Sequence, residues 1–374
     1  MSSKEDLSRK GEIIIEHADK WPALRSDWQR LYSASEVETF FLSPIWVDAW
    51  LATYGDDHGL NFVCFRLGGV LQGIVLISGR RAKGGLLSLE QLHLNTAGEG
   101  SGSPMVEHNA FVCMPEHQDT FAALLWHWLE EQIWDEFLFD GITRNSFTAI
   151  ATIPGAPNEE IWRNAPYVDL HHLRCNGNSF LDSLSKNSRQ KIRRSIRLYE
   201  EKAPIKLEYA PTKGVAITYF NELIQLHQPV WNSRGKLGAF ASDRMRTFHT
   251  KIIEAGQPRK DYDLIRISHG TETLGVIYNL IHANHISHYQ SGFSYQSDNR
   301  LKPGLIGHSL VIQDALEAGF DEYDFLATAD EGAQYKSSLS NANRQLGWIT
   351  YRRHSMRASL IRAAKSIRCR LNRS

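Results

Sequence analysis

The chain has 374 residues, of which 42% are hydrophobic and 22% charged, and its 42 basic and 42 acidic residues cancel. This composition is typical of a folded globular protein, and it excludes a disordered chain or one that its bulk charge draws to nucleic acid. Because domains commonly have about 100–200 residues, the length favours two domains.

The four cysteines are far apart and include no C-x-x-C pair. Their spacing argues against a zinc site or a disulfide framework and is typical of a protein in a reducing cytosol. Residues 1–10 are polar, unlike a signal peptide, and no apolar run reaches the ~18 residues of a membrane span. We therefore expect a cytoplasmic protein without a metal site.

Hydrophobic periodicity gives the first half a clear order of elements. The predicted order is helix, three strands, helix and strand, over 46–54, 61–67, 70–78, 86–94, 119–133 and 136–140. Gly68 and Gly69 predict a tight turn between the first two strands. The Gly- and Ser-rich stretch 95–104 is expected to be a loop.

The second half repeats this order. Its predicted elements are three strands, a helix and a short strand, over 263–267, 273–281, 285–293, 305–318 and 323–326. We therefore predict an α/β (α+β) protein with two similar domains, 1–175 and 176–351, each a mixed sheet flanked by helices. Residues 352–374 would form a basic tail.

The segment 179–201 predicts a strongly basic helix that begins at Ser179. Two interpretations remain open for it. Its cations could cover a solvated helix that bridges the domains, or they could contact a phosphate-rich ligand or an anionic surface.

A possible phosphate site follows the strand 285–293. Arg300 and Lys302 supply positive charge, while Gly304 and Gly307 at the start of the next helix would let a phosphate approach the backbone N–H groups. The alternative is an ordinary turn before a helix. On the strand itself, alternation predicts Tyr289, Ser291 and Phe293 on one face and His288 and Gln290 on the other. Tyr289 and His288 could transfer protons, or they could be ordinary sheet residues.

Two further segments carry candidate ligand-binding residues. A helix is expected to end near Pro229, and the surrounding stretch 227–240 combines aromatic, Arg and Gly residues, as binding loops often do. Its candidates are His227, Trp231 and Arg234. The stretch 323–348 offers Asp324, Tyr335 and Lys336, which suit recognition of an amine or a phosphate. Asp324 could equally be a structural hydrogen-bond acceptor. The chain contains no G-x-S-x-G, Walker A or H-E-x-x-H motif.

Taken in order, these segments resemble the GNAT-superfamily acetyltransferases. The segments that carry the resemblance read LSKNSRQKIRRSIR, LHQPVWNSRGKLGAF, HYQSGFS, LKPGLIGHSLVIQDALEAGFDEYDFL and YKSSLSNANRQLGW. They look most like the CelD-type acetyltransferases of cellulose and exopolysaccharide biosynthesis, and they are more distantly similar to the FemABX aminoacyl ligases. The resemblance covers about residues 40–350 and implies tandem GNAT-like domains.

The resemblance also implies a function. It implies N-acyl transfer from acetyl-CoA or another acyl-CoA to an amine, which would be an amino sugar or a cell-envelope or exopolysaccharide precursor. It maps His227, Trp231, Arg234, Tyr335 and Lys336 onto family motifs and adds Asp324 to the catalytic candidates. The loop before the helix departs from the regular glycine signature of coenzyme A sites. Transfer from aminoacyl-tRNA, or a silent scaffold in a polysaccharide-synthesis complex, therefore remains an alternative.

Two predictions concern the ends of the chain. The loop between Leu94 and Asp119 lacks a basic residue, so we expect no catalysis by the N-terminal domain, although Glu107 and His108 could contribute to acceptor binding between the domains. The basic stretch 352–373 has a thin apolar stripe. It could lie on an anionic inner-membrane surface, or it could be a docked or frayed tail. We expect no DNA partner.

Overall fold

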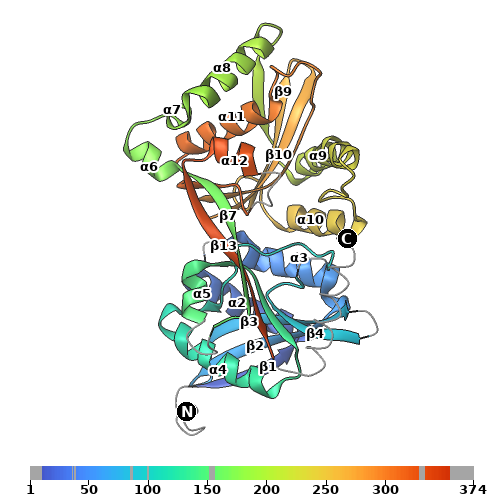
Figure 1. The fold of residues 1–374 in the computed structure, drawn as a ribbon, viewed down its shortest axis with the longest axis vertical. Helices are drawn as coiled ribbons and strands as arrows, with labels where there is room; N and C mark the ends of the chain where they lie inside the picture. The colour runs from blue at the N-terminus through green and yellow to red at the C-terminus, as the bar shows by residue number, and fades with distance from the viewer. Residues whose placement is uncertain are drawn as a thin grey trace, which may run out of the picture. The chain divides into compact units, whose positions relative to one another are not determined.

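The computed structural model describes residues 11–35, 37, 39–84, 87–98, 101–150, 156–327 and 333–353. The chain divides into two compact units. Unit 1 contains Met1–Trp162 and Leu346–Ser374, and unit 2 contains Arg163–Gln345. The division falls at 162/163 rather than at 175/176, so the chain passes from one unit to the other inside β7 (Glu159–Asp169) and inside β13 (Ala342–Arg352) (Figure 1).

Unit 1 is built on a mixed sheet in the order β1-β2-β3-β4-β6-β13, with β5 paired to β3. Its strands are β1 (Glu12–His17), β2 (Gly59–Leu67), β3 (Val70–Gly84), β4 (Leu87–Leu94), β5 (Val112–Cys113) and β6 (Glu136–Thr143), and its helices are α2 (Trp21–Ala34), α3 (Pro44–Tyr54), α4 (Gln118–Glu131) and α5 (Arg144–Ile150). On β2, Phe62 packs against Trp28 of α2, and Phe65 packs against Phe121 of α4. Because side chains alternate along a strand, α2 and α4 cover opposite faces.

Unit 2 has a sheet in the order β7-β12-β11-β10-β9-β8. Its further strands are β8 (Ile205–Tyr209), β9 (Tyr262–His269), β10 (Glu272–His282), β11 (His285–Phe293) and β12 (Glu322–Asp324), and its helices are α6 (Leu170–Cys175), α7 (Phe180–Ser183), α8 (Lys186–Glu200), α9 (Lys213–Ser233), α10 (Asp243–Ala255), α11 (Pro303–Glu317) and α12 (Ala333–Leu339). Ile277 of β10 shares a core with α11, and the next residue, Tyr278, contacts α9 and α10. The helices therefore cover both faces of this sheet (Figure 1).

The two sheets repeat one topology. In unit 1, β2, β3 and β4 run antiparallel, α4 follows, and β6 then pairs parallel with β4. In unit 2, β9, β10 and β11 run antiparallel, α11 follows, and β12 then pairs parallel with β11. This order and the mixed α/β fold confirm the predicted fold class.

Two predicted helix boundaries were wrong. The segment 179–201 forms two helices, because Ser185 accepts a hydrogen bond from the Ser188 N–H and begins α8 as a new N-cap. Ser179 does cap the preceding helix, α7. The other helix, α9, continues through Pro229 to Ser233. Its last turns are tied to the following loop, since the Gln228 side chain donates to the Leu237 carbonyl and accepts from the Phe240 N–H.

In unit 1, Asn109 fills the gap where the parallel strands β4 and β6 diverge. Its side-chain amide donates to the carbonyl oxygens of Leu94 (2.9 Å) and Asp140 (3.0 Å), and its oxygen accepts from the Asn95 side chain (2.9 Å). Its own backbone N–H donates to the Gly141 carbonyl (2.9 Å). Asn109 is fully buried and thus satisfies the ends of both strands.

We predict that Asn109→Ala lowers the free energy of unfolding by about 1–3 kcal/mol, because it leaves buried carbonyl groups without donors. Urea unfolding followed by tryptophan fluorescence measures this loss. Asn343→Ala is the matched control, since Asn343 is exposed and its amide donates to Asn164. Equal stability of the two variants would contradict the role assigned to Asn109.

Candidate functional site

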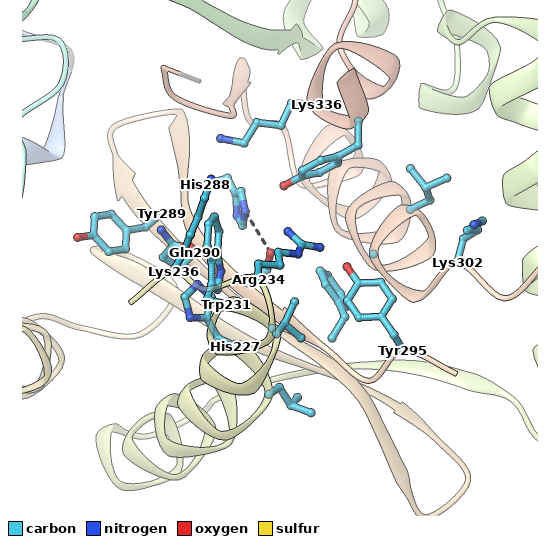
Figure 2. Close-up of a pocket in the computed structure, with 18 of the residues that line it drawn as sticks. His227, Trp231, Arg234, Lys236, His288, Tyr289, Gln290, Tyr295, Lys302 and Lys336 are labelled. Atoms are coloured by element: carbon cyan, nitrogen blue, oxygen red, sulfur yellow. Dashed lines mark hydrogen bonds between the residues drawn. The ribbon is translucent and has the colours of Figure 1, made fainter. Parts of the chain in front are cut away.

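The candidate site lies in unit 2, where β11 and β12 diverge. Within the described chain, β12 pairs with β11 at His285, Ile286 and Ser287 and no further. Beyond these residues, positions 288–293 of β11 line a cavity of about 550 Å³, which is also bounded by the end of α9, the start of α11, Ala327 and α12 (Figure 2). An opening of this size is within the range of small-molecule sites.

A β-bulge in β11 determines which side chains share a face. Tyr278 pairs with Gln290 and Asn279 pairs with His288, so Tyr289 is an extra residue between them. The Tyr289 ring lies 4.5 Å from that of His249 on α10, and Figure 2 shows it directed away from His288.

The bulge makes part of the predicted alternation wrong. Ser291 Oγ lies 3.5 Å from His288 Nε2, and the rings of both His288 and Phe293 contact His308 of α11. Ser291 and Phe293 therefore share the face of His288 instead of that of Tyr289. Sequence alternation missed this because one inserted residue reverses the order of faces after it.

The first turn of α11 forms one wall of the cavity. No side chain caps this helix, whose N-cap is Lys302, and the first-turn residues Gly304 and Leu305 line the cavity. The Lys302 N–H donates to Ser195 Oγ of α8 (2.8 Å), which fixes the approach to the helix. The positive end of the α11 dipole therefore adjoins the opening.

The two glycines of this turn have different surroundings. A Cβ on Gly304 would make ordinary contacts of 3.4 Å and longer with Phe293 and Tyr295. A Cβ on Gly307 would lie 2.9 Å from both Ile267 and Phe293. Gly307 lies outside the cavity lining, and its contacts explain it as the residue that lets α11 approach the sheet closely.

The cavity lining is cationic. It includes Arg234, Lys236, Lys302 and Lys336, and none of the described residues that line it is an Asp or a Glu. Arg300 lies outside the lining, where its guanidinium is paired with Asp298 at 2.7 Å and holds the pKa of that carboxyl down to about 2. Of the two predicted phosphate-binding cations, the structure brings Lys302 to the cavity.

The end of α9 supplies the opposite wall. His227 is buried beside Trp231, with ring centroids 5.7 Å apart, and Arg234 and Lys236 lie 5.8 and 5.9 Å from the Trp231 ring. Burial lowers the pKa of His227, although hydrogen bonds with Gln228 and Gln290 oppose this. The cavity is lined by His227, Trp231, Arg234 and Lys236.

Lys336 and His288 lie close to each other at one side of the cavity (Figure 2). The Lys336 ammonium donates to the Phe325 carbonyl (2.6 Å). Burial lowers the pKa of His288 well below its usual value, and the neighbouring His308 and Lys336 lower it further. His288 is therefore neutral near pH 7, as a general base must be.

Besides Arg300 and Gly307, three more predicted site residues lie outside the cavity lining. Asp324 is buried and accepts from the Leu326 N–H (2.6 Å), so it holds a turn in which Leu326 has the left-handed φ of 62°. Glu107 and His108 belong to unit 1, where the Glu107 carbonyl accepts from Thr39 Oγ1 (3.1 Å). Tyr335 does line the cavity, beside Lys336.

Sequence reasoning assigned no role to several groups at the site. Ser291, Lys236 and Tyr295 line the cavity, while Asn279 contacts His288 from β10. Asn279 could not be found from local motifs because it meets His288 only through strand pairing. In the described part of the chain, no cluster of three or more His, Cys, Asp or Glu side chains is arranged to hold a metal ion. No described helix is long and apolar enough to cross a bilayer.

Comparison with known proteins identifies the fold. The acetyltransferase (GNAT) domain family matches residues 186–337. Of solved structures, FemX is similar with a TM-score of 0.58 at 12% identity, covering 91% of this chain and 97% of FemX. A conserved protein of unknown function from Bacteroides thetaiotaomicron VPI-5482 has a TM-score of 0.55 at 10% identity, covering 91% of this chain and all (100%) of its own.

L-PGS from Bacillus licheniformis is similar with a TM-score of 0.54 at 10% identity, covering 92% of this chain and 96% of its own. No curated protein matches the sequence. At these identities the structural similarities establish the fold alone. Together with the domain family that matches residues 186–337, they show that the chain has a GNAT-like fold.

We predict that Gly292→Ala destabilises unit 2 by about 1–3 kcal/mol, because the added Cβ would lie 2.8 Å from the Leu223 carbonyl and 2.9 Å from Leu226 of α9. Gly214→Ala is a control on the same helix, where no atom lies within 4 Å of the new Cβ. Thermal unfolding should show a lower Tm for Gly292→Ala only. An unchanged Tm would mean that α9 moves away from β11 without cost.

Proposed function

We propose that this chain is an N-acyltransferase that moves an acyl group from acyl-CoA to an amine. The observation that carries the proposal is the cationic cavity at the open first turn of α11. Backbone N–H groups at a helix N-terminus bind phosphates well, and a lining that has cations without carboxylates favours a polyanionic donor.

The donor would enter with its phosphates at Lys302 and Gly304 and its thioester towards His288 and Lys336. Apolar lining from Phe293 and Leu305 suits the pantetheine arm between these ends. The Lys336 ammonium could stabilise negative charge that develops on the thioester carbonyl oxygen. In this arrangement Arg300 contributes less than Lys302 to phosphate binding, because its guanidinium is paired with Asp298.

The acceptor would lie against the end of α9, where His227, Trp231 and Arg234 present an aromatic and polar surface. Such a surface suits a sugar ring. With the resemblance to CelD-type enzymes, this favours an amino sugar or an exopolysaccharide or cell-envelope precursor as acceptor. We propose that Glu107 and His108 of unit 1 assist acceptor binding and that the reaction occurs in the cytoplasm.

The predicted membrane contact of the C-terminal tail concerns residues 352–374, of which 354–374 lie outside the described residues. It therefore stays a proposal about peripheral association with the inner membrane. Unit 1 is proposed to have no acyl-transfer site of its own, because Asn109 occupies the divergence of β4 and β6 that in unit 2 forms the cavity.

A second candidate is transfer from aminoacyl-tRNA, as the resemblance to FemABX ligases implies. The exposed cations of α8 favour this candidate, because they extend the positive surface beyond Lys302. These cations are Lys191, Arg193, Arg194 and Arg197. A polyanion longer than a nucleotide could use this helix.

We predict that the protein binds acetyl-CoA with micromolar affinity and that Lys302→Ala raises the Kd about tenfold or more. A charge-assisted contact of this kind is worth about 1.5–3 kcal/mol, and about 1.4 kcal/mol corresponds to a tenfold change in Kd. Isothermal titration calorimetry measures the Kd.

Arg300→Ala is the matched control, since it removes a neighbouring cation outside the cavity lining and should change the Kd less. An equal loss in both variants would place the phosphates on the loop surface instead of in the cavity. If the protein binds aminoacyl-tRNA but not acetyl-CoA, the second candidate is supported. Binding of neither donor would contradict both and favour a scaffold.

A further inference from the structure

A buried chain of hydrogen bonds leads from the cavity into unit 2. It begins at Ser291 Oγ, which lies 3.5 Å from His288 Nε2. His288 Nδ1 lies 3.3 Å from the side-chain oxygen of Asn279 on β10, and this oxygen also accepts from the Tyr323 hydroxyl (3.2 Å). Tyr323 Oη lies in turn 3.4 Å from His308 Nδ1. Ser291 and His288 line the cavity, whereas the other members lie behind them.

The orientation of the Asn279 amide favours one tautomer of His288. An amide oxygen can only accept hydrogen bonds, so with this oxygen facing His288 Nδ1 the proton of the imidazole lies on Nδ1. His288 Nε2 is then left as an acceptor, and it faces the Ser291 hydroxyl. The dashed line in Figure 2 marks this contact at His288.

We propose that Ser291, His288 and Asn279 form a proton relay in which Ser291 is the catalytic residue that takes the proton of the acceptor amine. The inference rests on the proposed acyltransferase function. Ser291 and His288 are the members that face the cavity, and Asn279 is a positioning residue that acts through His288.

The relay balances the transfer reaction. The amine nitrogen attacks the thioester carbonyl carbon, so a C–N bond forms and the C–S bond breaks. The amine proton passes to Ser291 Oγ while the hydroxyl proton of Ser291 passes to His288 Nε2. The imidazolium then returns a proton through Ser291 to the departing thiolate, which leaves as a thiol. A base of this kind is needed because the described lining has no carboxylate.

The surroundings of His288 keep it ready to accept a proton. The titratable groups that face it are His308 of α11, Tyr323 of β12 and Lys336 of α12. None of these is an anion near pH 7: burial lowers the pKa of His308 to about 3 and raises that of Tyr323, and Lys336 is a cation. The pKa of His288 is depressed by its burial and then by the neighbouring His308 and Lys336. A base works in its unprotonated form, so the acid limb of the rate profile should lie well below pH 6.5.

The first experiment measures turnover of acetyl-CoA with D-glucosamine as the probe acceptor. Ser291→Ala should lower kcat about 10²–10⁴-fold with little change in the Kd for acetyl-CoA, and Ser291→Thr should recover part of the rate by restoring a hydroxyl group. Ser287→Ala is the matched control, because Ser287 is on the same strand but outside the cavity lining. If Ser291→Ala turns over at the rate of the Ser287→Ala control, the relay is wrong.

The second experiment measures the pH dependence of kcat/KM. Asn279→Asp places a carboxylate of the same shape at His288 Nδ1, and an opposite charge raises the pKa of a histidine. The acid limb should therefore move up by about one to three pH units relative to the unmodified protein. A merely structural role of Asn279 would lower the rate at every pH and leave the limb in place.

The third measurement does not depend on turnover. In ¹⁵N-histidine NMR spectra of the full chain at pH 7, His288 should be neutral with its proton on Nδ1, assigned from its loss in His288→Gln. A neutral Nε2–H tautomer or a charged ring would overturn the relay even if the enzyme transfers acyl groups. Absence of acetyl-CoA binding and turnover, with the Nδ1–H tautomer present, would instead count against the proposed function.

Discussion

The divergence of two parallel strands is the constraint on which the site depends. Once β11 and β12 stop pairing after Ser287, their backbone groups need other partners and the space between them must be filled or left open. In unit 2 the first turn of α11 and the side chains of β11 border an open space. In unit 1 the same divergence is closed by one asparagine, Asn109, which bonds to both strands. At the point where the parallel strands diverge, unit 2 therefore has a cavity, whereas in unit 1 the side chain of Asn109 fills the space.

Charge and burial are separated within this cavity. The cations lie at the C-cap of α9 and in the loop after it, at the N-cap of α11 and on α12, whereas His288 and His227 are buried on β11 and on α9. Low dielectric surroundings keep His288 and His227 neutral, because desolvation disfavours the imidazolium. The cavity can thus hold cations that bind an anion next to neutral imidazoles that accept protons.

Much of the fold follows from the sequence, because strands with period-two hydrophobicity and the helix over 305–318 have strong local signals. Strand 285–293 agrees with β11 at both ends. What could not be predicted depends on contacts between distant residues. The passage of β7 and β13 between the units has no local signal, and the bulge at Tyr289 is set by its pairing with β10. Arg300 and Asp324 were also assigned to the site by sequence, but only the folded chain shows that Arg300 pairs with Asp298 and that Asp324 accepts from the Leu326 N–H.

The β-bulge also links the fold to the chemistry. If β11 paired regularly from His288 to Ser291, strict alternation would place Ser291 on the face opposite to His288, and the hydroxyl could not reach the imidazole. With the bulge, His288, Ser291 and Phe293 all face α11, while Tyr289 fills the aromatic layer beneath α10. The bulge therefore brings the Ser291 hydroxyl and the His288 imidazole together at the cavity wall. The cost of the irregular pairing is local, because β10 and β11 resume regular register on both sides of it.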